Sequence, residues 1–247
     1  MAIYAHDKIV PDKKSNTAKK IQVAEMFDSI ANRYDFLNHF LSAGIDKGWR
    51  KKGIKELQGI HPKTILDVAT GTGDLAITAN TILHPDKITG IDISEGMLEL
   101  GRKKIKALNI DDKIELIQGD SETINYKNSS FDAITVAFGV RNFENLEKGL
   151  SEMFRVLKPG GKVSIIECTI PKNFLLKGLY NFYMFTVVPV FGKLFASNGK
   201  AYKYLNSSVQ AFPNRQSFLN IMHKAGFKNV YYKSLSLGIC CIYCGSK

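Results

Sequence analysis

The sequence predicts an α/β fold: a doubly wound, mostly parallel sheet with an antiparallel edge strand, preceded by extra helices. Apolar runs of strand length alternate with amphipathic helical segments between residues 64 and 167. The first run enters a glycine turn at Gly71 and Gly73, the pattern of a sheet that binds a ligand beyond its strand ends. The 247 residues, 45% of them hydrophobic, are expected to form a single domain spanning residues 1–247.

The segment before the first strand is predicted to be helical after a short tail. Residues 1–16 are polar and Lys-rich without periodicity, so we expect a disordered tail there. Between Thr17 and Phe40 apolar residues recur at helical spacing, which indicates one or two amphipathic helices. A further helix should begin near Lys47 and include Trp49. We expect residues 17–60 to form a helical lid over the ligand site.

The central unit alternates strands with helices, which implies a parallel sheet. Strands are expected at 64–68, 87–91, 114–118, 131–138 and 162–167, and helices at 73–83, 94–108 and 146–157. An insertion at 171–212 follows, and then a helix at 214–225. Two closing strands, 230–234 and 238–243, are joined by a short turn and should be antiparallel at one edge of the sheet.

The first two strand ends carry residues suited to a nucleoside ligand. Gly71, Thr72 and Gly73 form a turn whose backbone amides, with the next helix N-terminus, can meet a carboxylate. Asp92 ends the second strand and can accept both ribose hydroxyls of an adenosyl ligand. Dehydrogenases use a similar glycine turn, so these residues alone do not distinguish a dehydrogenase from another protein that binds an adenosyl ligand.

The third and fourth strand ends extend the same site. Asp120 and Ser121 follow the third strand, where the Asp120 carboxylate could accept the exocyclic amine of adenine. Residues 137–142 follow the fourth strand, opposite the reactive end of such a ligand. Because the carboxyl ends of parallel strands meet at one edge of the sheet, the four segments are expected to surround one ligand.

Two segments distinguish the chain from dehydrogenases. Phe131-Asp132-Ala133-Ile134, followed by Val156-Leu157-Lys158-Pro159-Gly160-Gly161-Lys162, resembles the second half of a class I S-adenosylmethionine-dependent methyltransferase, whose Rossmann-like sheet is that predicted above. By the same resemblance, Asp67 matches the acidic residue that opens the family's glycine motif, and the cofactor is S-adenosylmethionine.

A narrower resemblance covers nearly the whole chain. It is to the quinone C-methyltransferases of menaquinone and ubiquinone biosynthesis, and it rests on these segments: Phe27-Asp28-Ser29-Ile30-Ala31, Tyr34-Asp35-Phe36-Leu37-Asn38, Leu41-Ser42-Ala43-Gly44, Trp49-Arg50, Phe138-Gly139-Val140-Arg141-Asn142, Ala201-Tyr202-Lys203-Tyr204-Leu205 and Phe212-Pro213. The sequence departs from the family at Leu37, Asp46 and Ala137, where Met, His and Ser are usual, so no role of that His or Ser is carried over.

The resemblance implies methylation of a ring carbon of demethylmenaquinol, a polyprenylated naphthoquinol, to give menaquinol. It points to Arg141 and Asn142 as catalytic residues that hold the developing phenolate. Because arginine stays protonated, it is not expected to be the base, and Asp120 could accept the proton if it faces the substrate. A structural ion pair is the alternative role for Arg141. No metal is required by this chemistry.

Two other functions remain open from the sequence. One is methylation of a ubiquinone precursor or another small molecule on the same fold. The other is a non-catalytic protein that binds a quinone or lipid.

The last third of the chain is basic and contains an apolar segment. Residues 168–247 include ten Lys or Arg and no Asp or Glu, in a chain of net charge +11. The insertion, mainly residues 174–191, is rich in aromatic and aliphatic residues flanked by lysines. It could bind the polyprenyl tail, contact an anionic membrane surface peripherally, or form a homodimer contact or an ordinary packed cap. The aromatic residues of the insertion lie within aliphatic runs, which disfavours nucleic-acid binding.

The remaining sequence features disfavour a membrane-spanning, a secreted or a metal-binding protein. No stretch reaches the roughly 18 apolar residues of a membrane span, and no secretory signal is seen. With four cysteines that suit a reducing compartment, we expect a cytoplasmic protein, with the inner face of the cell membrane as a further location. Cys241 and Cys244 lack a second pair or grouped histidines, so no metal site is predicted.

Overall fold

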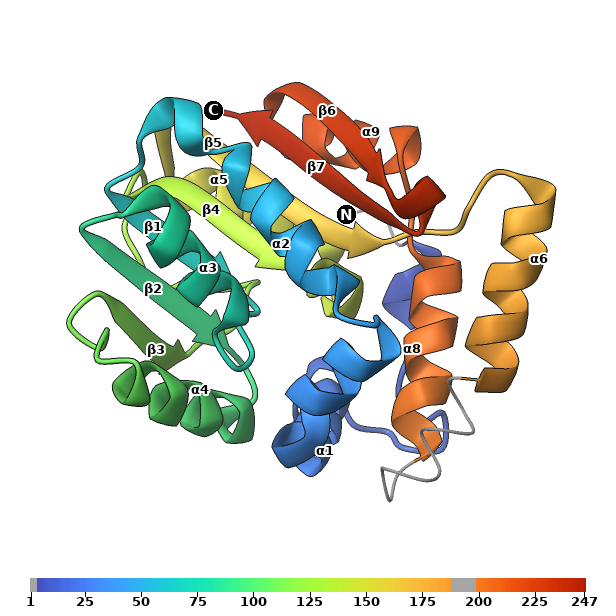
Figure 1. Ribbon diagram of the computed structural model, residues 1–247. Helices are drawn as coiled ribbons and strands as arrows, with labels where there is room; N and C mark the ends of the chain where they lie inside the picture. The colour runs from blue at the N-terminus through green and yellow to red at the C-terminus, as the bar shows by residue number, and fades with distance from the viewer. Residues whose placement is uncertain (1–3, 188–198) are drawn as a thin grey trace.

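The computed structural model describes residues 4–187 and 199–247, and it confirms the predicted fold class (Figure 1). Within these residues a seven-stranded sheet has the order β3-β2-β1-β4-β5-β7-β6. In it β7 runs antiparallel to both β5 and β6, and the remaining neighbours pair in parallel. The strands are β1 (Thr64–Val68), β2 (Lys87–Asp92), β3 (Ile114–Gln118), β4 (Phe131–Ala137), β5 (Leu157–Cys168), β6 (Lys228–Leu235) and β7 (Cys240–Ser246).

Helices cover both faces of this sheet. They are α1 (Lys19–Leu41), α2 (Ile45–Lys55), α3 (Asp74–Leu83), α4 (Glu95–Ala107), α5 (Leu146–Val156), α6 (Phe174–Phe182), α8 (Gly199–Ala211) and α9 (Gln216–Lys224). Short turns add η1 (Ala5–Lys8), η2 (Gln58–Ile60), η3 (Val140–Asn142), a π-helical turn η4 (Tyr183–Val187) and η5 (Ser236–Gly238).

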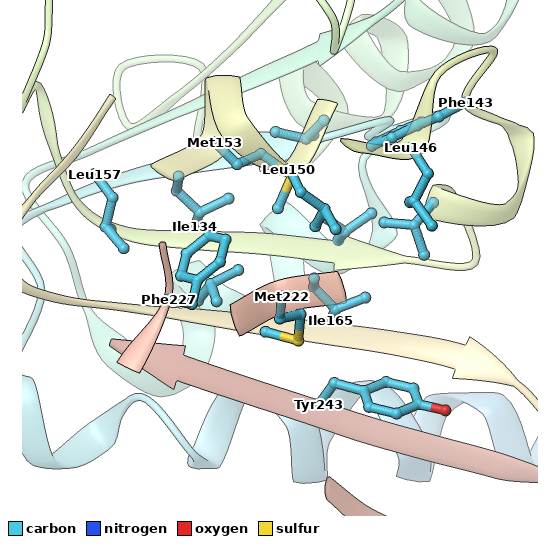
Figure 2. Close-up of a cluster of buried hydrophobic side chains, with 14 of the residues drawn as sticks. Ile134, Phe143, Leu146, Leu150, Met153, Leu157, Ile165, Met222, Phe227 and Tyr243 are labelled. Carbon is cyan, nitrogen blue, oxygen red and sulfur yellow. The ribbon is translucent and has the colours of Figure 1, made fainter. Parts of the chain in front are cut away.

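Local sequence explains where the central helices begin and which face they bury. The Asn145 side chain accepts a hydrogen bond from the Lys148 amide at 3.0 Å and caps α5, and Ser94 caps α4 in the same way. Along α5, Leu146, Leu150 and Met153 recur at helical spacing and are fully buried. Figure 2 shows these side chains facing those of β4 and β5, so the apolar stripe of α5 forms one core of the domain.

A second core lies on the opposite face of the sheet. It is built by α2, α3 and α4 over β1 and β2, with Ile54, Leu75 and Leu98 as buried contributors. A Cβ added at Gly53 would lie 2.5 Å from Cδ1 of Ile166, so α2 packs closely against β5. Burial on both faces accounts for the nearly continuous apolar runs of the central strands.

The prediction of a disordered tail at residues 1–16 is wrong for the described residues 4–16. Ala5–Lys8 form η1, and the Tyr4 hydroxyl donates to Glu147 Oε1 at 2.6 Å. The His6 ring is buried and meets Phe212 edge-on, with ring centroids 5.4 Å apart. The composition of the segment is polar, yet its aromatic side chains find partners that lie far away in the chain.

Several strand boundaries also differ from the prediction, among them the starts of β5 and β7. β5 begins at Leu157, five positions early, because Leu157 pairs with Phe131 before the register shifts at the glycine turn. β7 begins at Cys240 because residues 236–238 form the turn η5. The parts of the insertion that are described form α6, η4 and α8, whereas Pro189 and Gly192 lie outside the described residues. None of the described helices combines the length and the apolar character that crossing a bilayer requires.

Candidate functional site

The glycine turn after β1 and the carboxylate that ends β2 are joined directly. The Gly71 amide donates to Asp92 Oδ2 at 2.8 Å, and the Ser94 amide donates to Asp92 Oδ1 at 2.9 Å. Gly71 has a φ of +56° and Gly73 one of +80°, a backbone region that favours glycine. Burial and the nearby Asp28 carboxylate raise the pKa of Asp92, against the opposing effect of the amide donors. The Asp92 carboxylate is therefore fixed in orientation at the edge of the sheet.

A single cavity collects the carboxyl ends of β1 to β4 beneath α1. Of the predicted ligand-binding residues, Gly71, Asp92, Asp120 and Ser121 line it, together with Asn142 from η3. The remaining lining residues are Lys20, Val23, Phe27, Tyr34, Ala69, Ile93, Met97, Gly119, Glu122, Ala137, Phe138, Gly139, Phe143 and Glu144. The cavity thus lies where the strand order reverses between β1 and β4, the usual ligand position in such sheets.

Three other predicted cofactor-binding residues lie behind the cavity wall. Asp67 is fully buried and accepts hydrogen bonds from the Thr70 and Thr135 hydroxyls, both at 2.6 Å. Burial raises the pKa of Asp67 to about 6. The Thr72 hydroxyl donates to Asp35 on α1 at 2.6 Å, and Gly73 provides the left-handed residue before α3. These residues shape the turn rather than line the cavity.

Arg141 lies in a buried ion pair next to the cavity. Its Nη1 donates to Glu167 Oε1 at 2.8 Å and also to the Phe138 carbonyl oxygen. Burial opposes the charge of Arg141, but the Glu167 carboxylate outweighs it and raises the pKa of the guanidinium. The adjacent Asn142 lines the cavity, and its Oδ1 has no hydrogen-bond partner among the described residues. The structure therefore brings Asn142 to the cavity and places Arg141 behind it.

Asp120 is engaged on both carboxylate oxygens. Its Oδ1 accepts the Glu122 amide at 2.8 Å, and its Oδ2 lies 3.0 Å from Lys20 Nζ on α1. Lys20 was not foreseen from the sequence, because 100 positions separate it from Asp120. Glu122 was also missed, although its place two residues after Asp120 could have signalled it.

Helix α1 is tied across the cavity by further polar contacts. Asp28 Oδ1 accepts hydrogen bonds from the Ser94 hydroxyl at 2.6 Å and from the Gly96 amide at 3.0 Å. Asp35 Oδ2 lies 2.7 Å from Lys104 Nζ on α4. Together with the Thr72–Asp35 hydrogen bond, these contacts connect α1 to the glycine turn and to both ends of α4.

The cysteines and histidines do not assemble a metal centre in the part of the chain that the structure describes. Cys240, Cys241 and Cys244 are buried free thiols on β7, and Cys168 is half-buried. Cys240 and Cys244 pack in one core and Cys241 in the other, as alternation along a strand requires.

Comparisons with known proteins agree on one family. Residues 13–247 match the model of the ubiE/COQ5 methyltransferase family. A demethylmenaquinone methyltransferase of Bacteroides fragilis is 46% identical over 99% of both chains. A ubiquinone/menaquinone biosynthesis C-methyltransferase UbiE of Geotalea daltonii is 47% identical, over 94% of this chain and 98% of that one.

Solved structures share the fold at low identity. A putative S-adenosylmethionine-dependent methyltransferase of Methanococcus maripaludis superposes with a TM-score of 0.63 at 22% identity, over 94% of this chain and 96% of that one. Human N-acetylserotonin methyltransferase gives a TM-score of 0.62 at 17% identity, over 91% of this chain and 58% of that one. These matches support the doubly wound arrangement described above.

Proposed function

Because the chain belongs to the ubiE/COQ5 methyltransferase family, we propose that it methylates a ring carbon of demethylmenaquinol to give menaquinol. It is an S-adenosylmethionine-dependent C-methyltransferase. The main support for this substrate assignment is the Bacteroides fragilis relative, which is named for this reaction and is 46% identical over 99% of both chains.

The residues at the cavity fit the cofactor. Asp92 presents a fixed carboxylate for the two ribose hydroxyls, with Gly71 directly beside it. Asp120 and Ser121 line the same cavity and would meet the adenine. A Cβ at Gly139 would come within 2.6 Å of the Ala69 Cβ, so only glycine fits at position 139 of the cavity wall. S-adenosylmethionine, when bound, supplies a methyl group already activated by its sulfonium charge.

The chain's own task is to position the quinol, exclude water and help a ring hydroxyl lose its proton. Asn142 Oδ1 is buried without a partner among the described residues, and it would accept a hydrogen bond from that hydroxyl. Arg141 stays protonated beside Glu167, and its charge, from behind the cavity, would stabilise the developing phenolate. If Asp120 faces the quinol in place of the adenine, it is our candidate proton acceptor, with Lys20 holding its second oxygen. Residues 17–60, with α1 over the cavity, would act as the lid.

A ubiquinone precursor is the second candidate substrate. The Geotalea daltonii relative favours it, because its name covers both the ubiquinone and the menaquinone pathways and it is 47% identical. A protein that binds a quinone or lipid without catalysis is disfavoured, because the chain belongs to a methyltransferase family.

We further propose peripheral contact with the inner face of the cell membrane through α6. Phe174, Leu175, Leu179 and Phe182 on α6 are exposed, and Figure 1 places α6 at the outside of the molecule. The lysines at 172 and 177 flank this surface, in a region without acidic residues. Such a surface suits an anionic bilayer that also holds the polyprenyl tail. A homodimer contact is the competing role for the same residues.

The test is methyl transfer from labelled S-adenosylmethionine to reduced demethylmenaquinone. A demethylated benzoquinol precursor of ubiquinone is offered in parallel at the same concentration. We expect label in the naphthoquinol product and little in the benzoquinol. Label in the benzoquinol alone would replace the substrate assignment, and label in neither, despite cofactor binding, would refute it.

A further inference from the structure

Lys19, the first residue of α1, is a lysine buried in the interior of the protein. The residue is only 3% exposed. Its Nζ donates to the carbonyl oxygen of His6 at 2.8 Å and to that of Phe143 at 2.9 Å. Lysine is seldom fully buried, because removing an ammonium group from water is costly, so its presence here calls for an explanation.

The ammonium group of Lys19 is charged at neutral pH. Burial lowers the pKa of Lys19 to about 8, although the carboxylates of Asp7 and Glu122 oppose the shift. The amine is therefore mostly protonated at pH 7. In this form it has three protons to donate, and a charged donor binds a carbonyl oxygen more strongly than a neutral one.

The side-chain contacts of Lys19 flank Asn142. Besides the hydrogen bond to the Phe143 carbonyl, Lys19 Nζ lies 3.5 Å from the carbonyl oxygen of Arg141. The ammonium group thus holds the residues on either side of Asn142. Asn142 lines the cavity, and its Nδ2 donates to the Phe138 carbonyl oxygen at 3.4 Å. Its Oδ1, without a partner among the described residues, is the atom left to meet a ligand.

The backbone of Lys19 is attached to the same segment. Its amide donates to Glu144 Oε1 at 2.8 Å, and Glu144 also lines the cavity. One residue of the lid therefore binds the chain after β4 through both its backbone and its side chain. The bond to the His6 carbonyl adds η1 to the same assembly. Moving Asn142 away from its place would require these hydrogen bonds to lengthen or break.

We propose that Lys19 is a positioning residue for methyl transfer, whose buried ammonium group fixes the backbone on both sides of Asn142 and so holds Asn142 Oδ1 at the quinol. This inference rests on the proposed function. Lys19 is not among the residues that line the cavity, so it acts through Asn142 and not on the substrate. The effect is large in principle, because small displacements of a group that orients a substrate lower the rate steeply.

Replacing Lys19 by Met tests the ammonium group while keeping an unbranched side chain. We expect kcat for reduced demethylmenaquinone to fall about tenfold, measured well below the Tm of each variant. The affinity for S-adenosylmethionine, measured by titration calorimetry, should change less than about twofold. If Lys19→Met does not fold, Lys19→Gln takes its place, since a shorter amide side chain cannot hold both carbonyl groups.

A double-mutant cycle with Asn142→Ala distinguishes positioning from a general structural role. We expect Asn142→Ala to lower kcat by itself. If Lys19 acts through Asn142, adding Lys19→Met to that variant should lower kcat by less than about twofold more. A loss of packing or stability that does not involve Asn142 would instead lower kcat by the same factor in both backgrounds.

The matched control is Lys247→Met at the end of β7. Lys247 Nζ also donates to two backbone carbonyl oxygens, those of Phe154 at 2.7 Å and Arg155 at 3.1 Å. These carbonyl groups lie at the end of α5, and none of the three residues lines the cavity. This variant should lower the Tm and leave kcat unchanged.

The outcomes separate the inference from the function on which it rests. An unchanged kcat in Lys19→Met, or equal losses in the two backgrounds of the cycle, overturns the role of Lys19 while the wild type still methylates the quinol. An Asn142→Ala variant as fast as the wild type would overturn it as well, by removing the residue through which Lys19 acts. If the wild type methylates neither quinol, the proposed function itself fails.

Discussion

The ring of His6 lies in the interior, stacked near Tyr4 and edge-on to Phe212. Burial, with a smaller effect from the Lys19 charge, lowers the pKa of His6 from 6.5 to about 3. The unfolded chain therefore binds this proton first as the pH falls. The contribution of His6 to stability is complete above about pH 6.5 and is lost progressively toward pH 3.

We predict that His6→Phe removes this part of the acid sensitivity. Its free energy of unfolding should decline less steeply than that of the wild type between pH 6.5 and pH 4, by roughly 1 kcal/mol per pH unit. Urea denaturation of both proteins at half-unit intervals measures the difference. Parallel pH profiles would show that the ring takes up its proton in the folded state at an ordinary pKa.

Asp92 is the residue on which cofactor binding should depend most. Asp92→Asn keeps the shape but replaces one acceptor oxygen by an NH₂ group, beside the Gly71 and Ser94 amides that donate to Asp92. We expect the affinity for S-adenosylmethionine to fall at least about tenfold in calorimetric titration. Asp86→Asn, an exposed change at the opposite end of the same strand, is the control and should bind as the wild type does. Equal affinities of both variants would contradict the role of Asp92.

At the scale of elements, α6 presents several large apolar side chains to solvent. Phe174 is 86% exposed and Leu179 67% exposed, whereas Tyr180 and Met184 pack inward on Leu41 and Leu205. The inner face thus fixes α6 to α1 and α8, and the outer face is exposed in the part of the chain that the structure describes.

We predict that Phe174→Ser with Leu179→Ser weakens sedimentation with vesicles that contain phosphatidylglycerol. Burying each of these side chains is worth about 1.5–3 kcal/mol, so the double change should lower partitioning more than tenfold. Leu108→Ser, at a residue 52% exposed after α4, serves as the control and should bind like the wild type. A wild-type dimer that the double variant converts to a monomer, without any vesicle binding, would assign the surface to self-association.

The elements themselves were predicted with different success. β1 and β3 have the predicted bounds, because each is a short apolar run between clear breaks. β5 was predicted too short, since its pairing across the Lys158–Gly161 turn depends on β4 and not on local pattern. The N-terminal residues were misjudged because the contacts of Tyr4 and His6 involve α5 and Phe212, far along the chain.

At the scale of the whole molecule, topology decides where chemistry can occur. β1 pairs with β2 on one side and β4 on the other, so the chain reverses direction of winding beside the glycine turn. Helix α1 then lies across the opening, and α8 lies between α1 and α6 (Figure 1). The first 60 residues thereby contribute lining residues to the cavity, and the insertion packs against α1, although more than 100 positions separate the two segments.

The sequence by itself determined the alternation of strands and helices, the glycine turn, and the placement of Asp92 and Asp120 at one edge. These features follow from local periodicity and from the common direction of parallel strands. Only the tertiary structure decided that Lys20 meets Asp120 and that Glu167 holds Arg141. Hydrogen bonding and burial at these residues depend on segments distant in the chain, and no local pattern records which distant segments will meet.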